Sequence, residues 1–312
     1  MNGSLATLAA NHGGVFTRAH ALQCGYSDED IYGLTHTGEW CRLRRGAFCA
    51  AHDLPDREED RHVLQARAVM LSLGPRVALS HVSAALALGL PVWGVDLSRV
   101  HITRLDAGAG RGEGDVVHHV GVLSRDELIW ADGLQVVNPT RAVLETACAA
   151  PFQSGVVTAD GALHQGMTTP EQLADCLEFV RSWPGSRKAS KVIPFADGRA
   201  ETPGESLTRV VIHDQDLPVP ELQAQIHDRT GRLVAEVDFL FKKQRVIAEF
   251  DGRLKYAGDA AESADTVYRE KRREDRLRAL GFVVVRISWA DLQYPRYTAN
   301  RIRQAFGTAA AA

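Results

Sequence analysis

Three carboxylate residues, Asp238, Glu249 and Asp251, lie in two short apolar segments of the sequence, LVAEVDFLF and RVIAEFD. The segments are separated by only three residues, KKQ. Carboxylates that crowd together repel one another unless they are protonated or bind a cation. Oxygen ligands suit Mg²⁺ or Mn²⁺, and such an ion can activate a water molecule for attack on a phosphoryl group. The three residues are therefore candidates for a hydrolytic metal centre.

Both segments have the composition of β-strands joined by a tight turn. Because side chains alternate along a strand, Glu249 and Asp251 share one face of the second segment. On the first segment, Val237 and Phe239 share a face and Asp238 lies on the opposite one. Asp238 can then lie beside Glu249 on one side of a sheet. The alternative is a set of solvated carboxylates on an exposed face, although strands disfavour Asp and Glu.

The elements around these strands follow a clear order. Thr202-Pro203-Gly204-Glu205 predicts the start of a helix, and LQAQIHD predicts a first strand before the other two. A second helix is predicted from about Ser263 to Leu280, ended by Gly281. The valine-rich FVVVRIS is the last strand. The order helix, three strands, helix, strand predicts a mixed α/β sheet.

The segments VDFLF, VIAEFDGRLKY and YREKRREDRLRALGFVVVRISWADL resemble the PD-(D/E)xK nuclease superfamily, closest to its Vsr-like (very-short-patch-repair) endonuclease branch and bacterial domains of unknown function. The likeness covers about residues 202–292. It implies a restriction-endonuclease-like αβββαβ domain with a Mg²⁺ (or Mn²⁺) cofactor. By this resemblance, Asp238 and Glu249 are catalytic metal ligands. Asp251 is a candidate third metal ligand because of its place in the carboxylate cluster.

Two further residues acquire catalytic roles through the resemblance. Glu205 matches an additional acidic position, although a capping box with Thr202 accounts equally well for it. The lysine expected two residues after Glu249 is Asp251 here. Lys255 is the candidate for a displaced lysine that stabilises the oxyanion, and the alternative is a surface lysine after a turn.

The predicted helix around REKRREDRLR is rich in both signs of charge. Lys271–Asp275 and Glu274–Arg278 have the i,i+4 spacing of ion pairs, so a solvated, salt-bridged face is one interpretation. The other is that its bases hold DNA phosphates beside the acidic centre. The residues predicted to do so are Arg269, Lys271 and Arg273.

The N-terminal segments SLATLAANHGG, FTRAHALQCGYS and DEDIYGLTHTG predict three short helices, and WCRLRRGAFCA predicts a hairpin. A helix-turn-helix with a basic wing is a DNA-binding arrangement, and a small helical docking module is the alternative. The third helix begins with three acids and contains no Lys or Arg. Predicted DNA contacts are therefore placed outside it, on Arg18, Arg42, Arg44 and Arg45.

This stretch, especially GVFTRAHALQCGYS and GEWCRLRRGAFCA, resembles the winged-helix domain of AbiEi-type antitoxins. LSHVSAALALGLP, VHITR and GLQVVNPTRAVLETAC continue the likeness. Antitoxins of this type repress transcription of their own operons in type IV toxin–antitoxin systems. The resemblance implies DNA as a partner, and it leaves the toxin and the oligomeric state unspecified.

Together these patterns predict an α/β multidomain protein. The predicted domains are a winged helix over residues 1–50, an α+β middle domain over 51–180, a polar linker over 181–201 that contains at most one short helix, and the nuclease-like domain over 202–312. In the middle domain, helices are predicted over about 57–73 and from Thr169.

Composition narrows the class of protein. The 312 residues carry a formal net charge of −3, which disfavours a general nucleic-acid-coating protein but allows a local basic groove. There is no apolar run long enough for a membrane helix and no signal-peptide pattern. The five cysteines are scattered without a CxxC motif, which favours reduced thiols. We therefore expect a cytoplasmic protein without membrane contact.

Three other signals are discounted at this level. GAGRGEGD (residues 108–115) lacks the Gly-Lys-Ser/Thr ending of a phosphate loop. Ser80-His81 and His118-His119 have no partner at the spacing of a metal motif, so they are interpreted as strand or cap residues.

Two functions remain, an enzyme and a binding protein. The first is a Mg²⁺-dependent DNA endonuclease that a winged helix directs to its target. The second is an antitoxin-like transcriptional regulator whose nuclease fold is catalytically silent. Asp251 at the lysine position favours the regulator, and the clustered Asp238, Glu249 and Lys255 favour the enzyme. The sequence-based prediction is the endonuclease.

Overall fold

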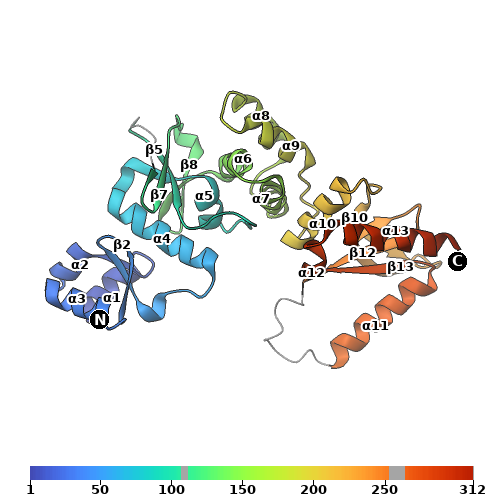
Figure 1. The fold of residues 1–312 in the computed structure, drawn as a ribbon, viewed down its shortest axis with the longest axis horizontal. Coiled ribbons are helices and arrows are strands. Elements are labelled where there is room, and N and C mark those ends of the chain that lie inside the picture. Colours follow the sequence, from blue (N-terminus) through green and yellow to red (C-terminus); the bar gives the residue numbers. More distant parts are fainter. Residues whose placement is uncertain (107–111, 253–263, 312) are drawn as a thin grey trace. The chain divides into compact units, whose positions relative to one another are not determined.

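The structure is a computed structural model that describes residues 1–106, 112–252 and 264–311 (Figure 1). Contacts between residues divide the chain into two compact units. The first comprises residues 1–162 and 166–195, and the second comprises 163–165 and 196–312. In the described part of the chain, no helix has both the length and the apolar character needed to cross a membrane.

The first unit begins with a small helical module closed by a three-stranded antiparallel sheet of order β1-β3-β2. Its elements are α1 (Gly3–Ala10), β1 (Val15–Thr17), α2 (Arg18–Gln23), α3 (Asp28–His36), β2 (Trp40–Arg44) and β3 (Ala47–Ala50). Side chains of Thr17 and Ser27 form capping boxes that begin α2 and α3. The three predicted helices and the hairpin are confirmed. β1 is an addition, and it occupies the residues predicted to begin the second helix.

A six-stranded mixed sheet forms the centre of the rest of this unit, in the order β6-β7-β5-β4-β9-β8. Its strands are β4 (Val77–Leu79), β5 (Val100–Arg104), β6 (Gly112–Glu113), β7 (Val116–His119), β8 (Leu128–Ala131) and β9 (Leu134–Val137). The helices are α4 (Glu58–Leu73), α5 (His81–Ala87), α6 (Pro139–Ala149), α7 (Phe152–His164), α8 (Pro170–Phe179) and α9 (Ser186–Phe195), with short 3₁₀ turns at Ala51–Asp53, Gly74–Arg76 and Arg125–Glu127. The predicted helices over 57–73 and from Thr169 are confirmed, the latter with its capping box.

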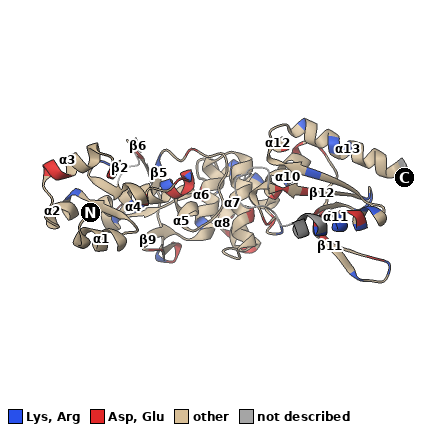
Figure 2. Cartoon of the chain, turned by 90° about the horizontal axis from the view of Figure 1, so that it is seen from below, with Lys and Arg blue, Asp and Glu red and all other residues tan. Residues whose placement is uncertain are grey.

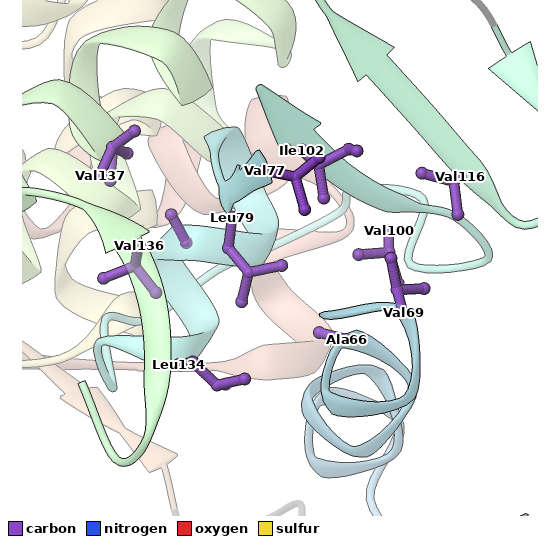
Figure 3. Packing of buried hydrophobic residues seen from close by; sticks show 12 residues of the cluster. Ala66, Val69, Val77, Leu79, Val100, Ile102, Val116, Leu134, Val136 and Val137 are labelled. Carbon is purple, nitrogen blue, oxygen red and sulfur yellow. The ribbon is translucent and has the colours of Figure 1, made fainter. Parts of the chain in front are cut away.

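Helix α4 connects the two sheets of this unit because it contributes to two cores. Ala66 and Val69 pack against the six-stranded sheet, beside residues such as Val100 (Figure 3). Leu64 and Ala68 pack against residues of the small sheet. The residues on either side of position 50 therefore share a continuous core.

The predicted linker over 181–201 contains a full helix, α9, whose residues Ala189, Val192 and Ile193 are buried. Their i, i+3, i+4 spacing gives the helix an apolar face within an otherwise basic sequence. That face packs among α6 and α8. The one helix that the sequence allowed within this stretch is present, and the two compact units divide after it, at Phe195.

The second unit contains a four-stranded sheet of order β10-β11-β12-β13, antiparallel except for the parallel β12–β13 pair. Its elements are α10 (Pro203–Asp214), β10 (Glu221–His227), β11 (Leu233–Phe241), β12 (Val246–Asp251), α11 (Ala264–Ala279), β13 (Val283–Ser288), α12 (Trp289–Leu292) and α13 (Pro295–Ala311). The predicted order of helix, three strands, helix and strand is confirmed, as is the mixed sheet. The last two helices were not predicted.

Helices cover both faces of this sheet. Phe239 and Phe241 pack in a core that includes α10 and α13, whereas Leu240 and Ile247 pack with Leu277 of α11. Val237 belongs to the second core, so the prediction that it shares a face with Phe239 is wrong. The alternation of the strand is interrupted at Asp238, the residue between them.

Candidate functional site

Phe239 and Ala248 form the last pair of the ladder between the antiparallel strands β11 and β12. Asp238 and Glu249 are the next residues along these strands beyond that pair. Both carboxylates line an open cleft of about 210 Å³. The rest of its lining is mostly charged: Glu236, Asp251, Glu270, Arg273 and Arg286, with Phe250 and Gly252. The structure therefore brings Asp238, Glu249 and Asp251 into one cleft, together with two arginines.

Asp238 is held by the backbone of the neighbouring strand. Its Oδ2 accepts a hydrogen bond from the Phe250 amide at 2.7 Å, one step beyond the end of the regular ladder. Burial raises the pKa of Asp238 to about 6, against the effect of this hydrogen bond, and the negative charge of Glu205 acts in the same direction as burial. Asp238 is thus more readily protonated than an ordinary aspartate.

Glu249 is buried and is bound by a single guanidinium group. Arg273 Nη2 donates to both carboxylate oxygens of Glu249, at 2.8 and 2.9 Å, and Nη1 donates to the Glu236 carbonyl at 3.3 Å. Burial raises the pKa of Glu249, whereas Arg273 acts to lower it. The structure places Arg273, which was predicted as a DNA contact, on the carboxylate instead.

Arg286 is a charged residue of the cleft that sequence reasoning missed. It lies on β13, directly opposite Glu249 in the parallel register. Its guanidinium is 3.8 Å from Asp251 and 2.9 Å from Glu270. Burial acts to lower the pKa of Arg286, but the four surrounding acids outweigh it and the pKa is raised. The signal was present in the sequence as the one charged residue of the strand FVVVRIS.

Glu205 has the contacts of a helix cap and a further contact with strand β10. Its backbone amide donates to Thr202 Oγ1 at 3.3 Å, and its carboxylate accepts from the Thr202 hydroxyl and from the Glu201 amide. The same carboxylate also accepts from Gln223 Nε2 on β10 at 2.9 Å. Burial raises the pKa of Glu205. Helix capping therefore accounts for part of its environment, and the contact with β10 and the charge effect on Asp238 go beyond it.

Gly204 is the residue that lets α10 approach the site. A Cβ atom at this position would lie 2.0 Å from Cε1 of Phe250. Only glycine permits this close contact between α10 and β12, which brings Glu205 towards the acidic cleft.

The carboxylates as arranged here do not fit a Mg²⁺ ion. The Arg273 guanidinium faces both oxygens of Glu249, and one oxygen of Asp238 accepts the Phe250 amide. Within the residues that the structure describes, no three carboxylates bring ligand atoms within 4.8 Å of one another. The Mg²⁺ or Mn²⁺ cofactor stays a prediction, and Lys255 lies outside the described residues.

The charged helix α11 carries both signs along its length (Figure 2). Arg278 forms an ion pair with Glu274, as the i,i+4 spacing predicted. Arg269 and Lys271 are exposed. Of the three bases predicted to contact DNA here, these two are exposed, and Arg273 is partly exposed and paired with Glu249.

The basic residues of the N-terminal module also differ in their exposure to solvent and in their ion pairs. Arg18 binds both oxygens of Asp28, at 2.7 and 2.5 Å, and so connects α2 to α3. The side chain of Arg44 is mostly covered and lies 3.4 Å from Asp115. Arg42 lies over the ring of Phe48 and is exposed, and Arg45 is exposed in the turn between β2 and β3.

Comparisons with known proteins add to this geometry. Residues 4–51 match the family described as a transcriptional regulator, AbiEi antitoxin. Over 215 residues the chain is 30% identical to the uncharacterized proteins MT2308 and Rv2248 of two Mycobacterium tuberculosis strains, CDC 1551 / Oshkosh and ATCC 25618 / H37Rv. The alignment covers 68% of this chain and 76% of each relative. The chain belongs to the family of these two proteins.

The N-terminal module of this family member is an AbiEi-type regulator domain, and its six elements coincide with the matched residues. The crystal structure of the RV2827C protein from Mycobacterium tuberculosis is also similar, with a TM-score of 0.42 and 16% sequence identity. That likeness covers 72% of this chain and 87% of the other.

Proposed function

We propose that the protein is a DNA-binding transcriptional regulator of the AbiEi antitoxin type, whose second unit has a nuclease-like fold without catalytic activity. The match of residues 4–51 to that regulator family carries the proposal. The order of elements in these residues, helix, strand, two helices and a hairpin, supports it, since a winged helix is a DNA-binding arrangement. The DNA of its own operon and a toxin encoded there are the partners that this function implies.

The surface of α3 supports binding to a DNA groove. Two of the three acids at its start are engaged, Asp28 by Arg18 and Asp30 by the backbone amide of Ser27, whereas Glu29 is exposed. Further along the helix, Tyr32 is 72% exposed and stacks on His36, with ring centroids 5.8 Å apart. These two residues, one helical turn apart, present an aromatic, hydrogen-bonding surface to base edges.

The wing supplies the phosphate contacts in this proposal. Arg45 is exposed in the turn of the hairpin, and Arg42 is exposed on β2. Arg44 has a different role, because its guanidinium is paired with Asp115 and mostly covered. We therefore assign DNA binding to Arg42 and Arg45 and a structural role to Arg44.

The contacts of Glu249 support a silent second unit. An active centre of the nuclease type needs this carboxylate to be available to a metal ion, and here Arg273 binds both of its oxygens. The residue at the usual lysine position is Asp251, which faces Arg286. In this proposal the two arginines offset part of the negative charge of the acidic cleft and make it a structural feature.

A gel-shift titration on the DNA upstream of the gene tests the regulator function. We expect Arg45→Ala to weaken binding to all DNA and to reduce the slope of log K against log[salt] by about one. We expect Tyr32→Ala to reduce the preference for the upstream DNA over unrelated DNA by about tenfold, or roughly 1.4 kcal/mol. Arg181→Ala, an exposed arginine on the same unit, is the matched control. A wild-type protein without any preference for the upstream DNA would overturn the proposal.

A metal-dependent endonuclease is the second candidate, because Asp238, Glu249, Asp251 and Glu270 line one cleft. Plasmid DNA with Mg²⁺ or Mn²⁺ distinguishes the two. The proposed silent unit gives no cleavage with wild-type protein. Cleavage that disappears in both Asp238→Ala and Glu249→Ala would instead establish the hydrolase.

A further inference from the structure

Three histidines from separate elements of the first unit meet at one point. His101 on β5 and His119 on β7 belong to parallel strands, where Thr103 is the direct partner of His119. They are therefore diagonal neighbours on one face of the sheet. His81, the first residue of α5, stacks on His119 with ring centroids 3.6 Å apart. His81 and His119 occupy the helix-start and strand positions that their sequence context predicts, and His101 was not considered from the sequence.

The nitrogens of this cluster have the arrangement of a ligand set. One ligand atom from each of the three residues lies within 4.8 Å of the others, and no other group of three or more His, Cys, Asp or Glu does so among the described residues. His101 Nδ1 and His119 Nε2 are 2.9 Å apart. Two nitrogens bound to one tetrahedral Zn²⁺ at its usual bond length are about 3.3 Å apart, so only a small shift is needed.

Two groups lie at one ring nitrogen of His81. Ser80 Oγ is within hydrogen-bond distance of His81 Nδ1, at 3.1 Å, and Glu145 Oε2, which accepts the His81 backbone amide at 3.0 Å, lies 3.4 Å from the same nitrogen. Arg141 Nε donates to the other oxygen of Glu145 at 2.7 Å. Metal-binding histidines usually have a carboxylate or carbonyl at the second ring nitrogen. This arrangement leaves His81 Nε2 as the ligand atom.

The backbone of His81 is strained, with φ of +54°. A non-glycine residue in this region costs about 1–3 kcal/mol and persists where its surroundings hold it, often at functional sites. The hydrogen bond from its amide to Glu145 is the contact that holds it here. The strained conformation directs the imidazole onto His119.

Burial of the cluster favours neutral imidazoles. Burial lowers the pKa of His101 and His119 to about 4, and the neighbouring imidazoles act in the same direction. The pKa of His81 is lowered well below its ordinary value for the same reasons. Neutral imidazoles keep a lone pair for a metal ion, and imidazole suits Zn²⁺ and similar transition metals.

We propose that His81, His101 and His119 bind a divalent transition-metal ion, with Zn²⁺ as the best fit. His81 and His101 line a cleft of about 330 Å³. A three-histidine site beside such a cleft leaves the fourth coordination position to water or to a small anionic ligand. This site lies on a different unit from the acidic cleft of Asp238 and Glu249, and it is independent of the proposed regulator function.

Metal titration of the full-length protein tests the proposal. Chelator-treated protein is titrated with Co²⁺ alone, followed by visible absorption, and the Co²⁺ is then displaced with Zn²⁺ to obtain the affinity. We expect one ion per chain with the absorption of a tetrahedral site, and a Zn²⁺-dependent rise in Tm. His101→Gln and His119→Gln should each weaken Zn²⁺ binding by more than about 100-fold, and Glu145→Gln, which removes an outer partner, by about 10- to 100-fold.

Two control variants separate this site from other metal binding. His213→Gln changes an exposed histidine, and the double variant Asp238→Asn with Glu249→Gln changes the acidic cleft. Both should bind Zn²⁺ as the wild type does. The proposal is overturned if wild-type protein shows no stoichiometric tetrahedral Co²⁺ spectrum. It is also overturned if folded His101→Gln keeps wild-type affinity, or if the acidic-cleft variant loses it. The Co²⁺ spectrum of the wild-type protein tests the proposed metal site even if a histidine variant does not fold.

Discussion

The carboxyl group of Asp238 ionises less readily in the folded protein than in the unfolded chain. Burial raises its pKa from 3.8 to about 6. An acid whose pKa is raised by folding binds more protons in the native state, so stability falls as the pH rises through this interval. The loss of folding stability caused by ionising the buried Asp238 is absent below about pH 4 and fully present above about pH 6. Two pKa units correspond to at most about 3 kcal/mol.

Asp238→Asn should therefore stabilise the protein at neutral pH. Asparagine keeps an oxygen to accept the Phe250 amide and has no charge to bury. We expect the free energy of unfolding at pH 7 to rise by about 1–3 kcal/mol over wild type, with the difference vanishing near pH 4. Urea unfolding between pH 4 and pH 8 measures this. The exposed Asp275→Asn is the control, and a variant less stable than wild type at pH 7 would contradict the argument.

The three candidate carboxylates of the acidic cleft, Asp238, Glu249 and Asp251, were named from the sequence, but their pairings were not. The short turn between β11 and β12 was enough to bring Asp238 and Glu249 together, although the predicted alternation of β11 is interrupted at Asp238. The role of Arg273 could not be derived in the same way, because a charged helix offers many arginines and only its packing onto the sheet decides which one reaches Glu249. Arg286 was missed because its partners come from β12 and α11, far away in sequence.

At the scale of elements, the contact between α10 and β12 depends on Gly204. A methyl group there would overlap the ring of Phe250, which itself packs edge-on against Trp289. We expect Gly204→Ala to lower the free energy of unfolding by about 1–3 kcal/mol, as for other overpacked sites. Urea unfolding at neutral pH measures the loss.

Two comparisons show whether contact with the Phe250 ring causes the destabilisation expected for Gly204→Ala. Gly307→Ala changes a helical glycine of the same unit with open space around it, and it should stabilise by about 0.5–1 kcal/mol. In a Phe250→Ala background, Gly204→Ala should cost far less than in wild type. An equal cost in both backgrounds would show that the clash with Phe250 is not responsible.

Elements with strong local signals were predicted, and those that depend on distant pairing were not. Thr169 and Thr202 begin helices as caps, and Gly281 ends α11 with a φ of +84°. β1 is only three residues long and exists because it pairs with β3. The order of the six-stranded sheet is equally non-local, which is why the three histidines could not be recognised from their spacing in the sequence.

At the scale of the whole molecule, the net charge of −3 means that the proposed DNA binding must be local. The exposed bases of the wing lie in the first unit, whose apolar cores are built from its own residues. The cores around the acidic cleft are likewise built from residues of the second unit. Each unit therefore has the interior that independent folding requires.

A fragment of residues 1–195 should consequently fold and bind the upstream DNA with the preference of the full chain. It keeps α9, whose buried face completes the packing of α6 and α8. A fragment that ends at residue 180, the predicted end of the middle domain, loses this helix and should be less stable. Circular dichroism and thermal unfolding compare the two fragments, and the gel-shift titration compares the longer one with the intact protein. If the longer fragment folds but has lost the DNA preference, the second unit takes part in recognition, and assigning the DNA contacts to the winged helix alone is wrong.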